Sequence, residues 1–233
     1  MIEDKVQPAL AGMTFNYIGR FTRIYKQLSL PVISTGRSFE YYRRIFFGNK
    51  SSSAVLRKLQ GQCVLDVGCG LTPYVSNSMF QACYSSGVDF YGIDPKLAEG
   101  FKLGRFDRAK IMATGRGKMN HDAPGLDKGI ATVADDLPFA DESVDLILSS
   151  YLLFAWIDDE DILEAIFREF DRVLKPGGKV KIFPAPAYDA GKIRHQGLRQ
   201  IIEAFEIDQA FLTRILHRTQ FPPAYMRTML KQP

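Results

Sequence analysis

The segment VLDVGCGLTPY, residues 64–74, constrains the fold more than any other part of the sequence. Apolar residues surround Asp66, as in a buried strand, and Gly68 and Gly70 follow at once, where a chain can turn sharply or approach a ligand closely. A strand that runs directly into a glycine turn is typical of an open α/β sheet, whose ligands bind beyond the carboxyl ends of the strands. The segment therefore predicts both a fold class and the position of a site.

The turn differs from a dinucleotide-binding fingerprint. The pattern GxGxxG would require a third glycine where this chain has Pro73, and the carboxylate of Asp66 would repel a pyrophosphate. Asp94 follows Gly70 by 24 residues, at the end of the next expected strand, where a carboxylate can accept hydrogen bonds from a ribose diol. The ligand is therefore expected to be a nucleoside without a pyrophosphate, with cationic or hydroxyl groups near Asp66.

Apolar strands and helices alternate over the rest of the chain. The expected strands are 63–67, 88–94, 129–134, 144–150 and 179–185, and the expected helices cross 73–86, begin at Pro95 and cover 159–174, where PGG ends the last one. After a helix at 198–205, the runs 209–218 and 224–232 predict an antiparallel pair. The pattern predicts a three-layer αβα sandwich in the α/β class, with a mostly parallel, seven-stranded sheet and a C-terminal antiparallel hairpin.

Three helices are expected before this alternation, at 14–28, 38–47 and 51–60, and this region is basic. Residues 1–60 hold 10 Lys and Arg against 3 Asp and Glu, a net charge of +7, whereas the remainder carries −3. We expect residues 1–60 to form a helical lid over a domain of residues 61–233, with Tyr41, Tyr42 and Arg43 as candidates that face a ligand. A simple solvated helix face stays open, as does contact with nucleic acid or an acidic membrane, which is less favoured.

Other features exclude several classes of protein. Cys63, Cys69 and Cys83 form no CxxC pair, so we expect reduced structural thiols and no metal site. No run is long and apolar enough for a membrane span, and the first residues do not resemble a secretory signal, so a cytoplasmic protein is expected. Residues 102–129 are basic and contain glycines without a clear period, and we expect a long loop or an irregular insertion there.

Four motifs in register with the expected strands resemble those of the class I S-adenosylmethionine-dependent methyltransferases. They are LDVGCG, YGIDP, DDLPFADESVDLILSS and VLKPGGKVKI, and they span residues 60–185. Each motif is weak by itself, whereas four in the right order are specific. The resemblance implies the methyltransferase fold and S-adenosyl-L-methionine as the cofactor.

The resemblance also implies roles for individual residues. Asp66, Gly68 and Gly70 correspond to the motif that holds the methionyl part, with Thr72 in place of a third glycine, and Asp94 corresponds to the acid that holds the ribose. The remaining implied cofactor contacts are Asp135, on the adenine side, and Ser149, after the fourth strand near the methyl group. Many relatives carry an acid where this chain has Val133, which leaves the adenine contact to Asp135 or to the backbone.

No strong general base is required, because the methyl group of the cofactor is already activated. Tyr151 and His195 are the candidates for a catalytic group, since both follow strands at the expected site. The segment Ser149–Tyr151 lacks the Asn/Asp-Pro-Pro-Tyr pattern of many amino methyltransferases, and no cysteine lies near the fourth strand. A small-molecule acceptor with an O, N or C nucleophile is therefore favoured. A methyltransferase acting on RNA or protein, or a non-catalytic binding module, is the alternative.

Overall fold

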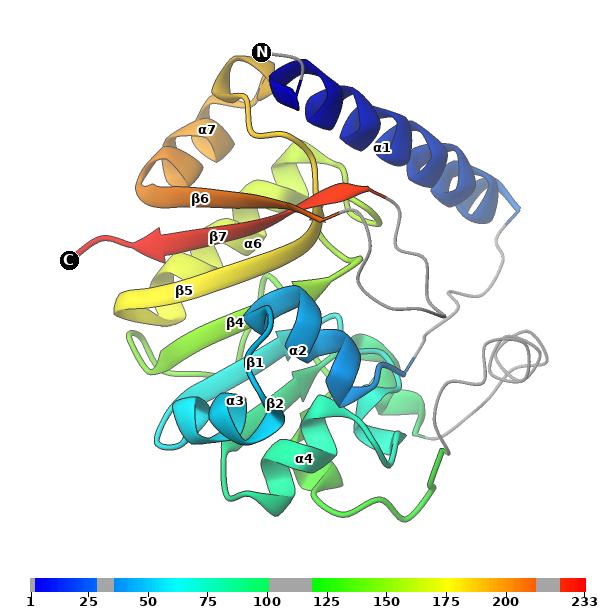
Figure 1. The fold of residues 1–233 in the computed structure, drawn as a ribbon, viewed down its shortest axis with the longest axis vertical. Helices are drawn as coiled ribbons and strands as arrows, with labels where there is room; N and C mark the ends of the chain where they lie inside the picture. The colour runs from blue at the N-terminus through cyan, green and yellow to red at the C-terminus, as the bar shows by residue number, and fades with distance from the viewer. Residues whose placement is uncertain (1–2, 29–35, 101–118, 213–222) are drawn as a thin grey trace.

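A seven-stranded sheet with helices on both faces forms the body of the protein (Figure 1). The computed structural model describes residues 3–28, 36–100, 119–212 and 223–233. The strand order is β3-β2-β1-β4-β5-β7-β6, in which β7 runs antiparallel to both of its neighbours and the other pairs are parallel. The predicted αβα sandwich and its C-terminal antiparallel pair are confirmed.

Strand β1 (Cys63–Val67) lies inside the sheet and has the bounds predicted for it. It pairs in parallel with β2 (Asp89–Ile93) on one side and with β4 (Val144–Ser150) on the other. Helices cover both faces of these strands, so adjacent residues such as Val64 and Leu65 are both fully buried although they point to opposite faces. The carboxyl ends of β1, β2 and β4 therefore meet at one edge of the sheet.

The C-terminal half of the sheet consists of β5 (Leu174–Ala185), β7 (Ala224–Lys231) and β6 (Phe205–Leu212). The β5 register against β4 shifts between Leu174 and Lys179, so residues 175–178 bulge out of the ladder. This bulge contains the PGG sequence, which was predicted to end the preceding helix. The helix already ends at Val173, and Gly177 supplies the positive φ that the bulge requires.

Helices fill the two outer layers. On one face, α6 (Glu160–Val173) and α7 (Gln196–Glu203) pack on the sheet, and on the other lie α2 (Phe39–Phe47), α3 (Ser52–Leu59) and α4 (Met79–Ser85). The side chain of Asp159 caps α6 by accepting hydrogen bonds from the first backbone N–H groups. Each face of the sheet therefore has its own apolar core.

The long helix α1 (Glu3–Gln27) lies near the start of β7, along the carboxyl edge of the sheet (Figure 1). The Thr14 hydroxyl donates to the carbonyl of Pro223 at 2.7 Å, and the Thr22 hydroxyl donates to the carbonyl of Ala155 at 3.2 Å. Pro223 precedes β7 and Ala155 follows β4, so these two bonds hold α1 across the ends of several strands.

In the sequence, Phe15, Ile18, Phe21, Tyr25 and Leu28 recur at helical spacing and predict an apolar stripe on α1, which is only partly buried. Phe21 and Leu28 belong to that stripe but are 50% and 63% exposed. The face that contacts the domain carries Ala11, Thr14 and Thr22, which are all at most 5% exposed. Phe15, Ile18 and Tyr25 of the stripe are partly buried, so the docked face combines part of the predicted apolar stripe with two hydroxyl groups that donate to backbone carbonyls.

Several predicted boundaries are wrong. The helix predicted across 73–86 is a short 3-10 turn at Thr72–Tyr74 followed by α4, which begins only at Met79, because Val75 forms a bridge with Met119 and Ser78 caps the helix. The helix predicted from Pro95 is a 3-10 helix, Pro95–Glu99. The strand predicted over 129–134 is limited to β3 (Gly129–Ile130), and β6 begins four residues before position 209.

Parts of two further predictions lie outside the described residues, namely 102–118 of the expected long loop and 213–218 of the expected hairpin. The division into residues 1–60 and 61–233 stays a prediction. None of the helices in the described ranges is long and apolar enough to cross a bilayer. All three cysteines carry free thiols.

Candidate functional site

The turn after β1 folds back onto the end of β2. The backbone N–H groups of Gly68 and Cys69 both donate to the carbonyl of Ile93, at 2.8 and 3.2 Å. Gly68 and Gly70 have φ of +79° and +56°, which glycine adopts without strain. A Cβ atom on Gly68 would lie 2.9 Å from the Cβ of Leu152, so the turn also requires glycine for space.

Asp94 connects this turn to the segment after β2. One carboxylate oxygen accepts a hydrogen bond from the Gly70 N–H at 2.8 Å, and the other accepts one from the Lys96 N–H at 2.9 Å. Each carboxylate oxygen has a second lone pair, which leaves both able to accept a hydroxyl hydrogen bond from a ligand. The structure thus brings Gly68, Gly70 and Asp94 together.

Asp66 lies beneath the turn and is completely buried. Its partner comes from α2, because the Tyr42 hydroxyl lies 2.9 and 2.7 Å from the two carboxylate oxygens. Tyr42 is itself fully buried, so this contact belongs to the interior. The candidate lid residue Tyr42 therefore contacts the site by its hydrogen bond to Asp66.

Burial raises the pKa of Asp66 from its ordinary value of 3.8 to about 7. The Tyr42 hydrogen bond and the nearby Arg37 guanidinium lower this pKa, and the charge of Asp94 raises it. Ionisation of Asp66 at neutral pH is therefore unfavourable, because the buried carboxylate has lost its hydration. A cation placed beside it would favour the ionised form.

Arg37 is a functional candidate that the sequence did not indicate. Its guanidinium carbon lies 4.8 Å from the ring centre of Tyr41 and 4.8 Å from that of Tyr151. The Tyr41 hydroxyl is 3.1 Å from Ser150 Oγ at the end of β4. Within the described ranges the guanidinium forms no hydrogen bond or ion pair, so its N–H donors can take an anionic ligand.

Two buried hydroxyl groups near the strand ends form no hydrogen bond within the described part of the chain. Thr72 and Ser149 are fully buried, and neither Oγ1 of Thr72 nor Oγ of Ser149 has a hydrogen-bond partner among the described residues. Unsatisfied buried hydroxyls are uncommon and often mark a place that a ligand or water completes. Tyr151 adds backbone strain at the same edge, because it is a non-glycine residue with a φ of +63°.

Other predicted site residues lie apart from this group. Asp135 is exposed and forms no hydrogen bond with a described residue. Arg43 lies on α2 but forms an ion pair with Glu40, with N–O distances of 2.6 Å, and its third contact is the Lys50 carbonyl. The structure does not bring either residue to Asp66.

His195 occupies the N-cap position of α7. Its Nδ1 lies 2.6 Å from a carboxylate oxygen of Glu164, and its Nε2 lies 3.1 Å from one of Asp161, both on α6. The imidazole therefore joins two helices of the outer layer. This position gives His195 a structural role, whereas Tyr151 lies at the site edge.

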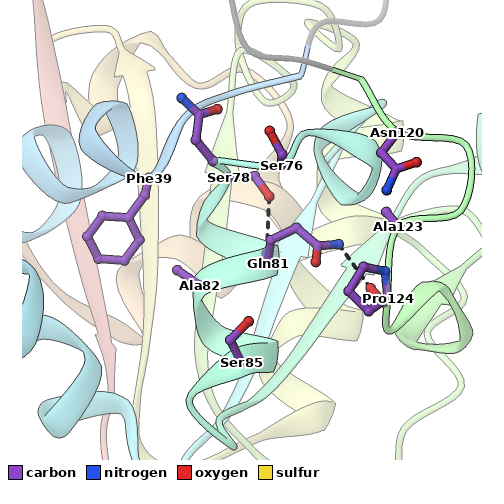
Figure 2. A pocket seen from close by; sticks show the side chains of 10 residues that line it. Phe39, Ser76, Ser78, Gln81, Ala82, Ser85, Asn120, Ala123 and Pro124 are labelled. Atoms are coloured by element: carbon purple, nitrogen blue, oxygen red, sulfur yellow. Dashed lines mark hydrogen bonds between the residues drawn. The ribbon is translucent and has the colours of Figure 1, made fainter.

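A cavity of about 440 Å³ opens beside α4 (Figure 2). Gln81 crosses it and donates from Nε2 to the carbonyl of Pro124 at 2.9 Å, and its backbone N–H donates to the Ser78 hydroxyl. Among the other lining residues are Phe39, Asn77 and Asn120. None of the motif residues lines this cavity, so it is separate from the candidate site.

Comparisons with known proteins agree with the motifs. A family model described as "Methyltransferase domain" matches residues 65–182, about half of the chain. Curated protein sequences give no match. Solved structures with a similar fold include S-adenosylmethionine-dependent methyltransferases from three organisms. They are those of Methanosarcina mazei (19% identity, TM-score 0.42, 76% of this chain and 97% of that chain), Aquifex aeolicus (16%, 0.41, 90% and 97%) and Archaeoglobus fulgidus (13%, 0.43, 83% and 99%).

These structural similarities are distant, so the family model carries the assignment. Its match runs from Leu65, next to Asp66, to Ile182 in β5, and so covers β1 to β5 together with the turn and Asp94. The strand order and the glycine turn agree with that assignment. The chain belongs to the methyltransferase domain family, within the class I S-adenosylmethionine-dependent methyltransferase superfamily.

Proposed function

We propose that this chain is an enzyme that transfers a methyl group from S-adenosylmethionine to an O, N or C nucleophile of a small molecule. The observation that carries the proposal is the buried carboxylate of Asp66 beside the Gly68–Gly70 turn and Asp94. A carboxylate in this position suits a cationic nucleoside and opposes a phosphorylated one.

The residues present fit the three polar parts of the cofactor. Asp66 would attract its ammonium group, since a cation there offsets the burial of the carboxylate. Asp94 would accept hydrogen bonds from the ribose hydroxyls, because both carboxylate oxygens retain a lone pair. The guanidinium of Arg37 would hold an anionic group, and the Ser149 and Thr72 hydroxyls, which have no partner among the described residues, offer further hydrogen bonds.

The cofactor supplies an activated methyl group on a sulfonium, and the task of the protein is mainly to position the acceptor. Ser149 and Ser150 at the end of β4, and Tyr151 directly after it, lie at the edge where an acceptor would bind. Helix α1 covers part of this edge through Thr22 and helps to exclude water. Positioning can lower a reaction barrier by about 7–11 kcal/mol in favourable cases.

Calorimetric titration with S-adenosylmethionine tests the cofactor site. The Asp94→Ala variant should bind it about 1–3 kcal/mol more weakly, because ribose hydroxyls lose their acceptor. Asp208→Ala, which changes an exposed acid on β6, is the control and should bind normally. Equal affinity of the Asp94→Ala variant and the unmodified protein would remove Asp94 from the site.

Release of S-adenosylhomocysteine in the presence of candidate acceptors separates an enzyme from a binding module. If the protein binds the cofactor but releases no S-adenosylhomocysteine with any of the acceptors, a binding module is favoured. An RNA acceptor has one supporting observation, the exposed Arg20 and Arg23 on α1. If these residues bind RNA, affinity for generic RNA should fall steeply with salt, and no binding at low salt would exclude that candidate.

A further inference from the structure

Arg227, in the middle of β7, is a buried cation with no anionic partner among the described residues. It is 2% exposed, and its Nη2 donates to the carbonyl of Pro186 at 2.8 Å. Its guanidinium carbon lies 5.1 Å from the ring centre of Phe154 and 5.3 Å from that of Tyr188. Nε has no hydrogen-bond partner, and Arg227 forms no ion pair in the part of the chain that the structure describes.

A second cation, Arg199, acts on the same tyrosine as Arg227. Arg199 on α7 and Arg227 both lower the pKa of the intervening Tyr188, which burial and the charge of Glu203 raise. Arg199 also has a buried Nε without a described partner, and its Nη2 donates to the carbonyl of Ile193. Glu203 is exposed, and neither guanidinium group forms an ion pair with an acid in the described ranges.

A buried, unpaired guanidinium is unfavourable because the protein interior solvates charge poorly. Burial lowers the pKa of Arg227 to about 10, and Tyr188 acts in the opposite direction. The side chain is therefore still charged at neutral pH. Two aromatic rings and one carbonyl stabilise it partly, but the buried Nε has no acceptor among the described residues. An oxyanion would supply both a negative charge and hydrogen-bond acceptors for the guanidinium.

The location of Arg227 connects it to the candidate site. Phe154 follows β4, Pro186 and Tyr188 follow β5, and Arg227 pairs with Ile182 near the end of β5. Helix α1 contacts Ala155, the residue after Phe154, through the Thr22 hydroxyl. Arg227 is thus at the carboxyl edge, next to the segment that follows Tyr151.

We propose that Arg227 anchors an oxyanion of the methyl acceptor, a carboxylate or a phosphate monoester attached to an aromatic ring that packs against Phe154 and Tyr188. The planar guanidinium matches both oxyanions in geometry and charge. The inference rests on the proposed function, because it names the substrate class of the same site.

Matched pairs of probes test the proposal. Hydroxybenzoates and aminobenzoates are compared with their neutral amides and with hydroxyphenyl phosphate, and binding is measured by ligand-detected NMR in the presence of S-adenosylhomocysteine. We expect at least one oxyanion probe to bind about 10-fold more tightly than its amide, a difference of about 1.4 kcal/mol. If the benzoates bind most tightly, the acceptor carries a carboxylate. If hydroxyphenyl phosphate binds most tightly, it carries a phosphate monoester. Equal binding of charged and neutral members of every pair would overturn the proposal.

The Arg227→Met variant should lose this preference, and Arg227→Lys should retain part of it. Arg168→Met, at an exposed arginine on α6, is the control and should keep the full preference. Without ligand, the melting temperature of Arg227→Met should be unchanged or higher, because an unpaired charge is removed. A fall of several degrees with the probe preference intact would instead assign Arg227 a structural role and refute the proposal.

The same measurements keep the two hypotheses apart. Oxyanion binding is read directly by NMR and does not depend on turnover, whereas the proposed function is tested by cofactor binding and release of S-adenosylhomocysteine. Cofactor binding with no oxyanion preference would refute the role of Arg227 alone. An oxyanion preference without any cofactor binding would refute the proposed function alone.

Discussion

Asp66 should make the stability of the protein without cofactor depend on pH. Its pKa rises from an ordinary 3.8 to about 7 in the folded protein, which corresponds to about 4 kcal/mol at about 1.36 kcal/mol per pKa unit. Below about pH 4 the group is protonated in both folded and unfolded chains. Between about pH 4 and pH 7 the unfolded chain ionises first, so this contribution to the free energy of unfolding decreases as pH rises, and above about pH 7 it is lost.

The Asp66→Asn variant removes that titration while keeping an acceptor for the Tyr42 hydroxyl. Its free energy of unfolding should match that of the unmodified protein near pH 4 and exceed it by up to about 4 kcal/mol at pH 8. Urea unfolding at intervals between pH 4 and pH 8 measures the difference. Asp135→Asn, at an exposed acid, is the control and should show no such trend.

The Tyr42→Phe variant tests the cause of the titration. Loss of the hydroxyl removes an interaction that lowers the pKa of Asp66, so the decrease in stability should extend to higher pH than in the unmodified protein. A pH-independent gap between the Asp66→Asn variant and the unmodified protein would show that burial does not control Asp66. Destabilisation of Asp66→Asn at pH 8 would refute the reasoning as well.

Three further outcomes are expected. Binding of S-adenosylmethionine at pH 6 should release a proton from Asp66, because the ammonium lowers its pKa, and calorimetry in buffers of different ionisation enthalpy should detect it. Gly68→Ala should destabilise the protein by more than the about 1–2 kcal/mol of a left-handed backbone, whereas Gly87→Ala, which has open space, should cost only that amount in urea unfolding. Thr22→Val should weaken the docking of α1 by about 0.5–1.5 kcal/mol, because the hydrogen bond to the Ala155 carbonyl is lost. Backbone amides of α1 should then exchange hydrogen faster, and unchanged exchange would contradict the role of Thr22.

Local sequence patterns predict the inner strands of the sheet and the glycine turn after β1. The strands 63–67 and 144–150 were predicted to the residue, because continuous apolar runs between turn signals have few other solutions in a sheet covered on both faces. The position of Asp94 follows from the same logic, since parallel strands end at one edge.

Contacts between distant segments could not be predicted from local patterns. Arg37 acquires its role from Tyr41 and Tyr151, and the second of these follows β4, more than a hundred residues along the chain. In sequence, Arg37 is only a basic residue before the serine that caps α2. Arg227 is likewise only one residue of the run 224–232 that predicts a strand, and tertiary packing shows that it is buried.

The reversed direction of β7 separates the two ends of the described chain. Lys231, its last residue, donates to the carbonyls of Asp171 and Leu174 at 2.6 and 3.0 Å, at the opposite rim from α1 (Figure 1). A solid support attached after Pro233 would therefore leave the carboxyl edge of the sheet, which α1 covers, accessible to dissolved compounds. Coupling through the amino end would hold the support against α1, so immobilised assays of this protein should be built on its carboxyl end.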